Sequence, residues 1–203
     1  MRPLFSGGSS LRCARDEAVK PALLLGLAFA VGVTTPSGSA SAAEKSHHLA
    51  LAPIGALLKV KDQAVSVGGG ASAMYTYGLT DQLNLMAEVS HSFVGIGQHL
   101  GSLPPGVRPG FVSTGAAGIS YVLDVLRWVP YGGVLLSGNA VGGGNLPNAV
   151  FAPGGQLALG LDYQFSRHVV AGVGFRQHLF FTKLSEYPSY STFFLKAEWQ
   201  WGY

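Results

Sequence analysis

The most constraining feature of this sequence is a two-residue alternation of apolar and polar side chains, clearest in residues 191–203. One set of alternate positions is apolar and holds Phe193, Leu195, Ala197, Trp199, Trp201 and Tyr203. The other set holds Thr192, Lys196, Glu198 and Gln200, with Phe194 as the exception. Because successive side chains of an extended chain point to opposite faces, this segment is predicted to be a long β-strand.

The same alternation recurs along the chain. It is regular in residues 66–77, 82–93, 155–165 and 169–181 and less regular in 48–60, 111–122 and 130–139, which with the last segment makes eight predicted strands. Their connections alternate between short turns (78–81, 124–129, 166–168) and longer loops (95–110, 140–154, 183–190), with 61–65 as a short link on the long side. An even number of strands joined in this way predicts an all-β, eight-stranded antiparallel up-and-down barrel of the transmembrane kind.

Composition and residue size indicate which face of the barrel points outward. Charged residues make up 11% of the chain, against about 25% in typical soluble domains. The glycines fall mostly on the polar face and the bulky aromatics on the apolar face. The lumen of an eight-stranded barrel is narrow, so small residues are expected inside and the apolar face outside, against lipid. A soluble lipocalin-like binding barrel, with the apolar face inward, is the alternative.

Aromatic residues cluster near the two ends of the predicted strands, as expected at the two interfaces of a membrane. The predicted periplasmic belt consists of Tyr77, Tyr121, Trp128, Tyr131, Tyr163, Phe165, Trp199, Trp201 and Tyr203. The predicted outer belt consists of Phe93, Phe111, Phe151, Phe181, Tyr187 and Tyr190. Trp128, Tyr163, Trp199, Trp201 and Tyr203 are the strongest candidates for membrane-interface residues.

The N-terminal region has the three parts of a secretory signal peptide. A basic opening precedes an apolar run at 21–33, and a small-residue tract with the Ala-Ser-Ala form follows at 40–42. We therefore expect residues 1–42 to be a cleaved signal peptide that includes Cys13, and residues 43–203 to be the barrel domain. That domain has five Lys and four Arg against eight acidic residues, a net charge of +1. Nucleic-acid binding, which needs a basic surface, is not expected.

The last strand ends in an aromatic residue with apolar residues at every second position before it. In this respect Trp199, Trp201 and Tyr203 resemble the C-terminal signal that the outer-membrane barrel assembly machinery reads. The predicted domain 43–203 resembles the barrel domain of the OmpA/OmpX-like outer-membrane β-barrel superfamily, although Tyr stands where Phe is usual. The resemblance implies a monomer in the outer membrane of a Gram-negative bacterium, in contact with membrane lipid and lipopolysaccharide. No C-terminal peptidoglycan-binding domain is expected, so a cell-wall tethering role does not carry over.

Five charged residues are predicted to face the lumen: Glu88, Asp162, Arg176, Lys196 and Glu198. We expect Glu88, Arg176, Lys196 and Glu198 to lie at similar height near the middle of the membrane, and Asp162 to lie lower with partial hydration. Unpaired buried charges cost several kcal/mol, so a salt-bridged plug is favoured over a transport or gating role. This interpretation predicts little or no channel conductance.

Enzymatic signals are weak. His91 and Ser92 are adjacent on a strand, so their side chains point to opposite faces. Arg176 and His178 resemble residues of barrel lipid A deacylases, but Phe180 stands where the serine nucleophile would follow. His47 and His48 are two histidines without a third metal ligand, and we expect them to lie in an unstructured N-terminal tail. We expect no catalytic site, cofactor or metal, and a role in envelope integrity or surface interaction through the loops. A barrel deacylase or acyltransferase acting on lipid remains the enzymatic alternative.

Overall fold

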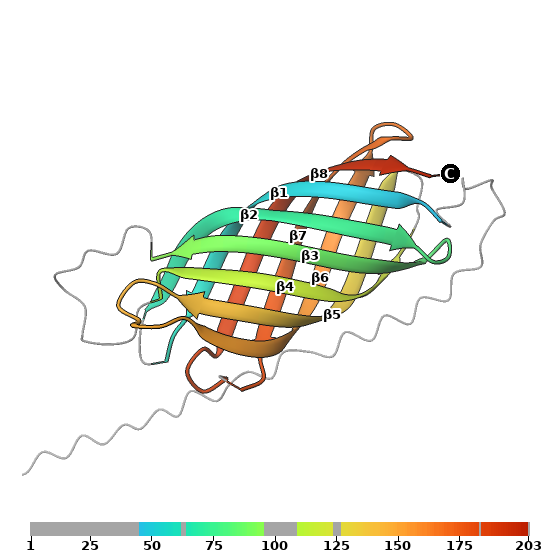
Figure 1. Cartoon of the computed structure of the whole chain (residues 1–203). Coiled ribbons are helices and arrows are strands. Elements are labelled where there is room, and N and C mark those ends of the chain that lie inside the picture. The colour runs from blue at the N-terminus through green and yellow to red at the C-terminus, as the bar shows by residue number, and fades with distance from the viewer. Residues whose placement is uncertain (1–44, 62–63, 96–108, 124–126, 183, 203) are drawn as a thin grey trace, which may run out of the picture. The chain divides into compact units, whose positions relative to one another are not determined.

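A computed structural model describes residues 45–61, 64–95, 109–123, 127–182 and 184–202 of the chain. They form the strands β1 (His47–Lys59), β2 (Val65–Gly78), β3 (Leu83–Val94), β4 (Phe111–Val122), β5 (Trp128–Gly142), β6 (Val150–Gln164), β7 (Val169–Phe180) and β8 (Ser189–Trp201). Each strand pairs antiparallel with its sequence neighbours, and β1 pairs with β8 to close the barrel (Figure 1). The predicted fold class is confirmed. Among the described residues, no helix has the length and apolar character needed to cross a membrane. The predicted signal peptide lies outside the described residues.

The two ends of the barrel differ in their connections. The terminal end, as we call it, holds the start of β1, the end of β8 and the turns after β2, β4 and β6. The loop end is the opposite one. The expected loop 140–154 is wrong in its bounds, because β5 continues to Gly142 and β6 begins at Val150. Gly143 and Gly144 have φ of 71° and 66°, a backbone conformation suited to glycine that allows the chain to turn sharply here.

Nearly all charged side chains of the strands point into the barrel. The strands contain six Asp, Glu, Lys or Arg residues, and five of them are buried: Glu88, Asp162, Arg176, Lys196 and Glu198. The sixth, Lys59, is the last residue of β1 at the loop end. The outward positions carry large apolar side chains such as Leu51, Val89 and Leu136, which are 65%, 64% and 73% exposed. Such a surface is suited to hydrocarbon rather than to water.

The height of the apolar band fits a bilayer. On β8 the band starts at Ser191, near the loop end, whose hydroxyl donates a 2.6 Å hydrogen bond to Gln177 on the outer surface. It ends at Trp199 and Trp201. Ten residues at about 3.3 Å each, tilted by about 40°, rise about 25 Å, the usual height of the lipid-facing band.

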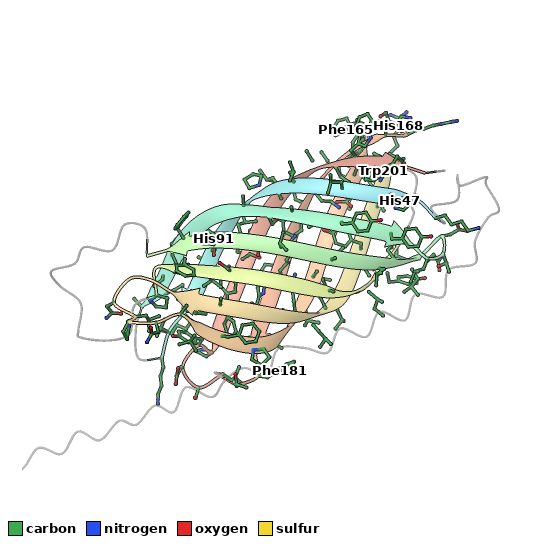
Figure 2. All side chains as sticks on the ribbon, in the orientation of Figure 1. His47, His91, Phe165, His168, Phe181 and Trp201 are labelled. Atoms are coloured by element: carbon green, nitrogen blue, oxygen red, sulfur yellow. The ribbon has the colours of Figure 1, made fainter. Side chains whose placement is uncertain are left out.

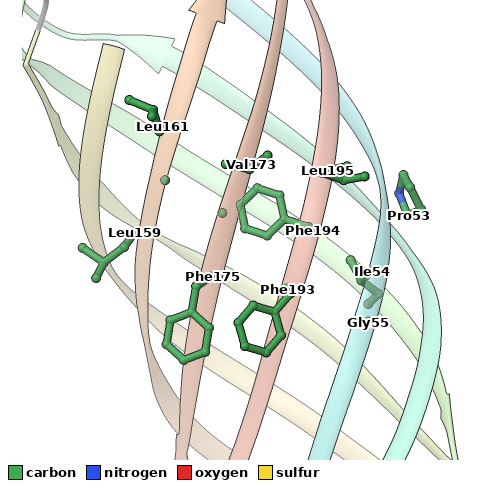
Figure 3. A pocket seen from close by; sticks show the side chains of 12 residues that line it. Pro53, Ile54, Gly55, Leu159, Leu161, Val173, Phe175, Phe193, Phe194 and Leu195 are labelled. Atoms are coloured by element: carbon green, nitrogen blue, oxygen red, sulfur yellow. The ribbon is translucent and has the colours of Figure 1, made fainter. Parts of the chain in front are cut away.

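An apolar hollow of about 840 Å³ interrupts this outer surface across β6, β7, β8 and β1 (Figure 3). Phe175 and Phe193, whose ring centroids are 5.0 Å apart, and the smaller residues Pro53 and Gly55 are among its lining residues. Pro53 has no backbone N–H, and the β1–β8 ladder lacks the pairs of Ala52 and Pro53. The hollow therefore lies over the seam at which the barrel closes.

The lumen is packed with side chains and contains two apolar clusters. The central cluster is formed by Ala50, Ala52, Ile54, Met74, Met86, Ala116, Tyr131, Leu135, Ala158 and Phe194. Inward glycines make room for its rings: a Cβ on Gly160 would overlap the ring of Tyr131, and a Cβ on Gly174 would overlap that of Phe194. Small residues line this narrow lumen because large ones occupy it from the opposite wall.

Three tyrosines expected in the two aromatic belts, Tyr131 in the periplasmic belt and Tyr187 and Tyr190 in the outer one, point into the barrel instead. Tyr131, Tyr187 and Tyr190 are buried, so their assignment to the membrane interfaces is wrong. Tyr131 lies three residues after the outward Trp128, an odd spacing that places the two side chains on opposite faces of β5. Nearness to a strand end was therefore insufficient to assign these rings to the exterior.

Candidate functional site in the barrel lumen

A buried ion pair joins β3 to β7. Arg176 Nε lies 2.9 Å from Glu88 Oε2, and the two side chains are 1% and 0% exposed. Gln156 Nε2 donates a second hydrogen bond to the same carboxylate oxygen at 3.0 Å. The guanidinium of Arg176 also lies 3.8 Å from the ring centroid of Phe194. The pair is thus held between a polar neighbour and an aromatic face, which partly offsets the loss of water around both charges.

A second ionic network lies nearer the terminal end. Lys196 Nζ contacts Asp162 Oδ2 and Glu198 Oε2, each at 2.7 Å. Glu198 Oε1 lies 2.7 Å from His48 Nδ1 and accepts a hydrogen bond from Gln200 Nε2 at 3.0 Å. The ammonium of Lys196 stands 4.8 Å from the ring centroid of Tyr131. Four strands, β1, β5, β6 and β8, are connected through this one network.

The structure divides the predicted charge cluster into two groups instead of one layer. Asp162 pairs across the sheet with Gly172, and Gly172 with Lys196, so Asp162 and Lys196 lie at the same ladder level on either side of Gly172. Arg176 lies four residues further along β7 than Gly172. The prediction that Lys196 and Glu198 lie level with Glu88 and Arg176 is wrong, because both belong to the network of Asp162, nearer the terminal end. The side chain of Asp162 is 10% exposed and is bridged to Lys196.

The two N-terminal histidines are part of the barrel, so their assignment to an unstructured tail is wrong. Both belong to β1, with His48 facing the lumen network. His47 faces outward, stacks on Trp201 at 5.7 Å between ring centroids, and is hydrogen-bonded to Tyr75 through Nδ1 and the phenol oxygen at 2.6 Å. The alternation from His47 through Leu49 and Leu51 was the signal that could have placed them.

An apolar and aromatic cap fills the loop end of the lumen. It consists of Ala56, Leu58, Val60, Val94, Val112, Val141, Ala152, Phe180, Tyr187 and Tyr190, with Leu146 packed against it. Phe180 lies 6.1 Å from Tyr190 and 6.0 Å from Tyr187 between ring centroids. The Tyr190 hydroxyl is hydrogen-bonded to Ser92 Oγ at 2.8 Å. Tyr187 belongs to a loop, so no strand pattern predicts its place in the cap. Phe180 is an apolar residue among the polar, inward positions of β7, and this break in the alternation was the signal that could have placed it.

The candidate catalytic residues lie apart from one another, on different faces of the barrel wall. His178 is 1% exposed, its ring is tilted against that of Tyr190 with centroids 4.5 Å apart, and its Nε2 lies 3.5 Å from Thr192 Oγ1. His91 faces outward and is hydrogen-bonded to Ser113, whereas Ser92 faces the lumen. His178 therefore lies beneath the aromatic cap, away from any lipid. Among the described residues, no cluster of three or more His, Cys, Asp or Glu side chains suits a metal ion.

The predicted interface aromatics that the structure describes lie at the terminal end, facing outward. Trp128 packs against Tyr163 at 4.8 Å between ring centroids, and Tyr163 against Phe165 at 4.9 Å. Trp199 stacks on His168 at 5.7 Å. In Figure 2, His47, Phe165, His168 and Trp201 lie at this end, and His91 lies toward the other. Tyr203, the last residue of the predicted assembly signal, lies outside the described residues.

Solved structures of similar fold include small outer-membrane barrels. They include neisserial surface protein A, NspA (TM-score 0.55, 13% identity, covering 79% of this chain and 100% of that one). Ail, the attachment invasion locus protein of Yersinia pestis, aligns with a TM-score of 0.56 and 9% identity over 78% of this chain and 99% of Ail. The N-terminal β-barrel domain of Pseudomonas aeruginosa OprF aligns with a TM-score of 0.51 and 14% identity over 78% and 98%.

These likenesses establish the fold. No protein-family model matches the chain, and no curated protein sequence matches it significantly. The chain has the architecture of the small eight-stranded β-barrels of bacterial outer membranes, with charges inside and an apolar band outside. The resemblance predicted from the alternating strands is confirmed at the level of fold.

Proposed function

We propose that this chain is a non-enzymatic outer-membrane β-barrel protein that supports envelope integrity or makes surface contacts through the loops at its loop end. The observation that carries the proposal is the division of charge: five of the six charged strand residues are buried inside, and the outward surface is apolar. A soluble lipocalin-like carrier would need the reverse arrangement on its outer surface. The loop end then faces the cell exterior, and the terminal end faces the periplasm.

The lumen is proposed to be closed to bulk solutes. Two barriers in series support this: the Lys196 network toward the terminal end and the Phe180–Tyr190 cap at the loop end. Purified protein in a planar bilayer is expected to give no stable, large, ohmic conductance. Such a channel would contradict the proposal of a closed lumen.

Surface interaction is proposed through the loops, as in many rigid scaffolds. Ail, which shares the fold, is named for attachment and invasion, and one Ail structure contains the heparin analogue sucrose octasulfate. The alternative of a lipid A deacylase or acyltransferase draws no support from His178, which is buried beneath the cap. The mass of lipid A is expected to be unchanged when the protein is overproduced.

Fractionation tests the proposed location. The protein is expected in the outer-membrane fraction, with a folded form that migrates faster than the boiled form in SDS gels. Comparison of envelope permeability with and without the gene then tests the envelope role. Recovery of the protein as a soluble periplasmic species would contradict the proposal.

A further inference from the structure

The outward aromatic residues differ in chemistry between the two ends of the barrel. All three tryptophans of the chain, Trp128, Trp199 and Trp201, lie at the terminal end. Tyr75, Tyr77, Tyr121 and Tyr163 also face outward in this half of the barrel. In the described part of the loop end, the outward aromatic rings other than His91 are those of Phe93, Phe111, Phe151 and Phe181. Rings that can donate hydrogen bonds are therefore concentrated at one end.

These rings form a belt around much of the terminal end. On β5 and β6 the belt runs through Trp128, Tyr163 and Phe165, whose successive ring centroids lie 4.8 and 4.9 Å apart. On β7, β8 and β1 it continues as two stacked pairs, His168 on Trp199 and His47 on Trp201, with centroid distances of 5.7 Å in each. Within the described residues, none of the three indole N–H groups has a protein acceptor.

Cations are placed among the rings. Arg127 precedes Trp128, Arg167 lies between Phe165 and His168, and Lys45 lies two residues before His47. All three side chains are exposed. Among the described residues, the acidic side chain on the outside of this end is that of Asp81, in the β2–β3 turn next to β1. The belt from β5 to β1 therefore combines positive charge with hydrogen-bonding rings on one continuous arc.

From this juxtaposition we propose that the arc binds the headgroups of anionic phospholipids in the leaflet next to the terminal end. The phosphate group of such a lipid would lie against Arg127 and Arg167, since guanidinium matches phosphate oxygens in geometry and charge. The indole N–H groups donate to the glycerol and ester oxygens at the same depth. The acyl chains lie on the apolar band below. This inference rests on the proposed function, because it requires the barrel to span a membrane.

The position of the tryptophans supplies a direct assay, because every tryptophan of the chain reports on this end. Barrel domain 43–203 is reconstituted in vesicles where either phosphatidylglycerol or phosphatidylcholine, at equal mole fraction, carries bromine on its acyl chains. Bromine quenches tryptophan only at close range. Brominated phosphatidylglycerol is expected to quench at least about twofold more strongly, as local enrichment of an anionic lipid requires.

The two matched variants each remove two positive charges, at opposite ends of the barrel. Arg127→Gln with Arg167→Gln is expected to abolish the preference for phosphatidylglycerol, whereas Lys59→Gln with Lys61→Gln, at the loop end, is expected to retain it. Heat-modifiable migration in SDS gels verifies that each variant is folded. Equal quenching of the unaltered protein by the two lipids, or an unchanged preference in the arginine variant, would overturn the inference. Loss of the preference in the lysine variant would also overturn it.

The same assay separates this inference from the proposed function. If neither brominated lipid quenches the tryptophans, the terminal end is not in a bilayer and both proposals fail. If both lipids quench equally, the barrel spans the membrane and only the lipid preference fails.

Discussion

The terminal end and the loop end of the barrel close the same narrow lumen by different physics. Toward the terminal end, Lys196 lies between Asp162 and Glu198, with His48 completing the network. At the loop end, Phe180, Tyr187 and Tyr190 pack among aliphatic residues, with a hydrogen bond between the hydroxyls of Ser92 and Tyr190 as a polar contact. The first closure depends on matched charges, and the second depends on packed apolar volume.

The difference shows how an eight-stranded barrel can combine a lipid-facing exterior with a stable interior. A lumen filled only with charges would require every one of them to be paired. Here the paired charges lie against the central apolar cluster, and a second apolar cluster fills the loop end. Both clusters pack like the core of a soluble protein. Sequence alternation is sufficient to tell inward from outward positions. It does not tell which inward positions form ion pairs and which form an apolar cluster.

The largest expected effect comes from removing the shared cation of the terminal-end network. Lys196→Met leaves Asp162 and Glu198 buried near each other without their common partner. We expect the free energy of unfolding to fall by about 3–5 kcal/mol. The measurement is urea unfolding in lipid vesicles, followed by tryptophan fluorescence.

The control for this variant is Lys61→Met, which removes the same charge from an exposed position beyond β1 at the loop end. It is expected to change stability by no more than about 0.5 kcal/mol. Equal effects of the two substitutions would show that the terminal-end network does not depend on charge pairing.

A smaller effect is expected at the loop end. Phe180 is 0% exposed, and Phe180→Ala leaves a cavity in the cap that is expected to cost about 3 kcal/mol. Its neighbour Phe181 is 63% exposed on the outer surface, and Phe181→Ala is expected to cost about 1 kcal/mol or less. The Phe180 variant should still show no conductance, since the Lys196 network remains. An ohmic channel in that variant would mean that the cap alone closes the lumen.

The smallest expected loss of stability comes from reducing the space that Gly160 leaves for the Tyr131 ring, next to Lys196. A Cβ at Gly160 would overlap the Tyr131 ring, so Gly160→Ala is expected to cost about 1–3 kcal/mol through overpacking. Gly115 has no atom within 4 Å of an added Cβ, so Gly115→Ala is expected to be nearly neutral. Comparison of the two unfolding curves measures the difference. Equal curves would show that the ring moves aside at no cost.

Sequence patterns predicted the elements better than the contacts between them. The eight strands, their antiparallel order and the inward direction of Glu88 and Lys196 follow from a period of two. The grouping of the charges does not, because it depends on the register between strands. The register of β6, β7 and β8 puts Asp162 and Lys196 at one level of the sheet. Arg176 pairs instead with Glu88 on β3. His48 joined a network through Glu198, a residue 150 positions away in the chain.

The alternating sequence by itself determined a barrel with an apolar exterior, because side-chain direction in a strand is a local property of the backbone. The tertiary structure alone decided which inward groups meet. Ring closure brings β1 against β8, and the stagger of neighbouring strands sets the height of each side chain in the lumen. The Lys196 network and the aromatic cap both depend on that stagger, which cannot be read from a local sequence pattern.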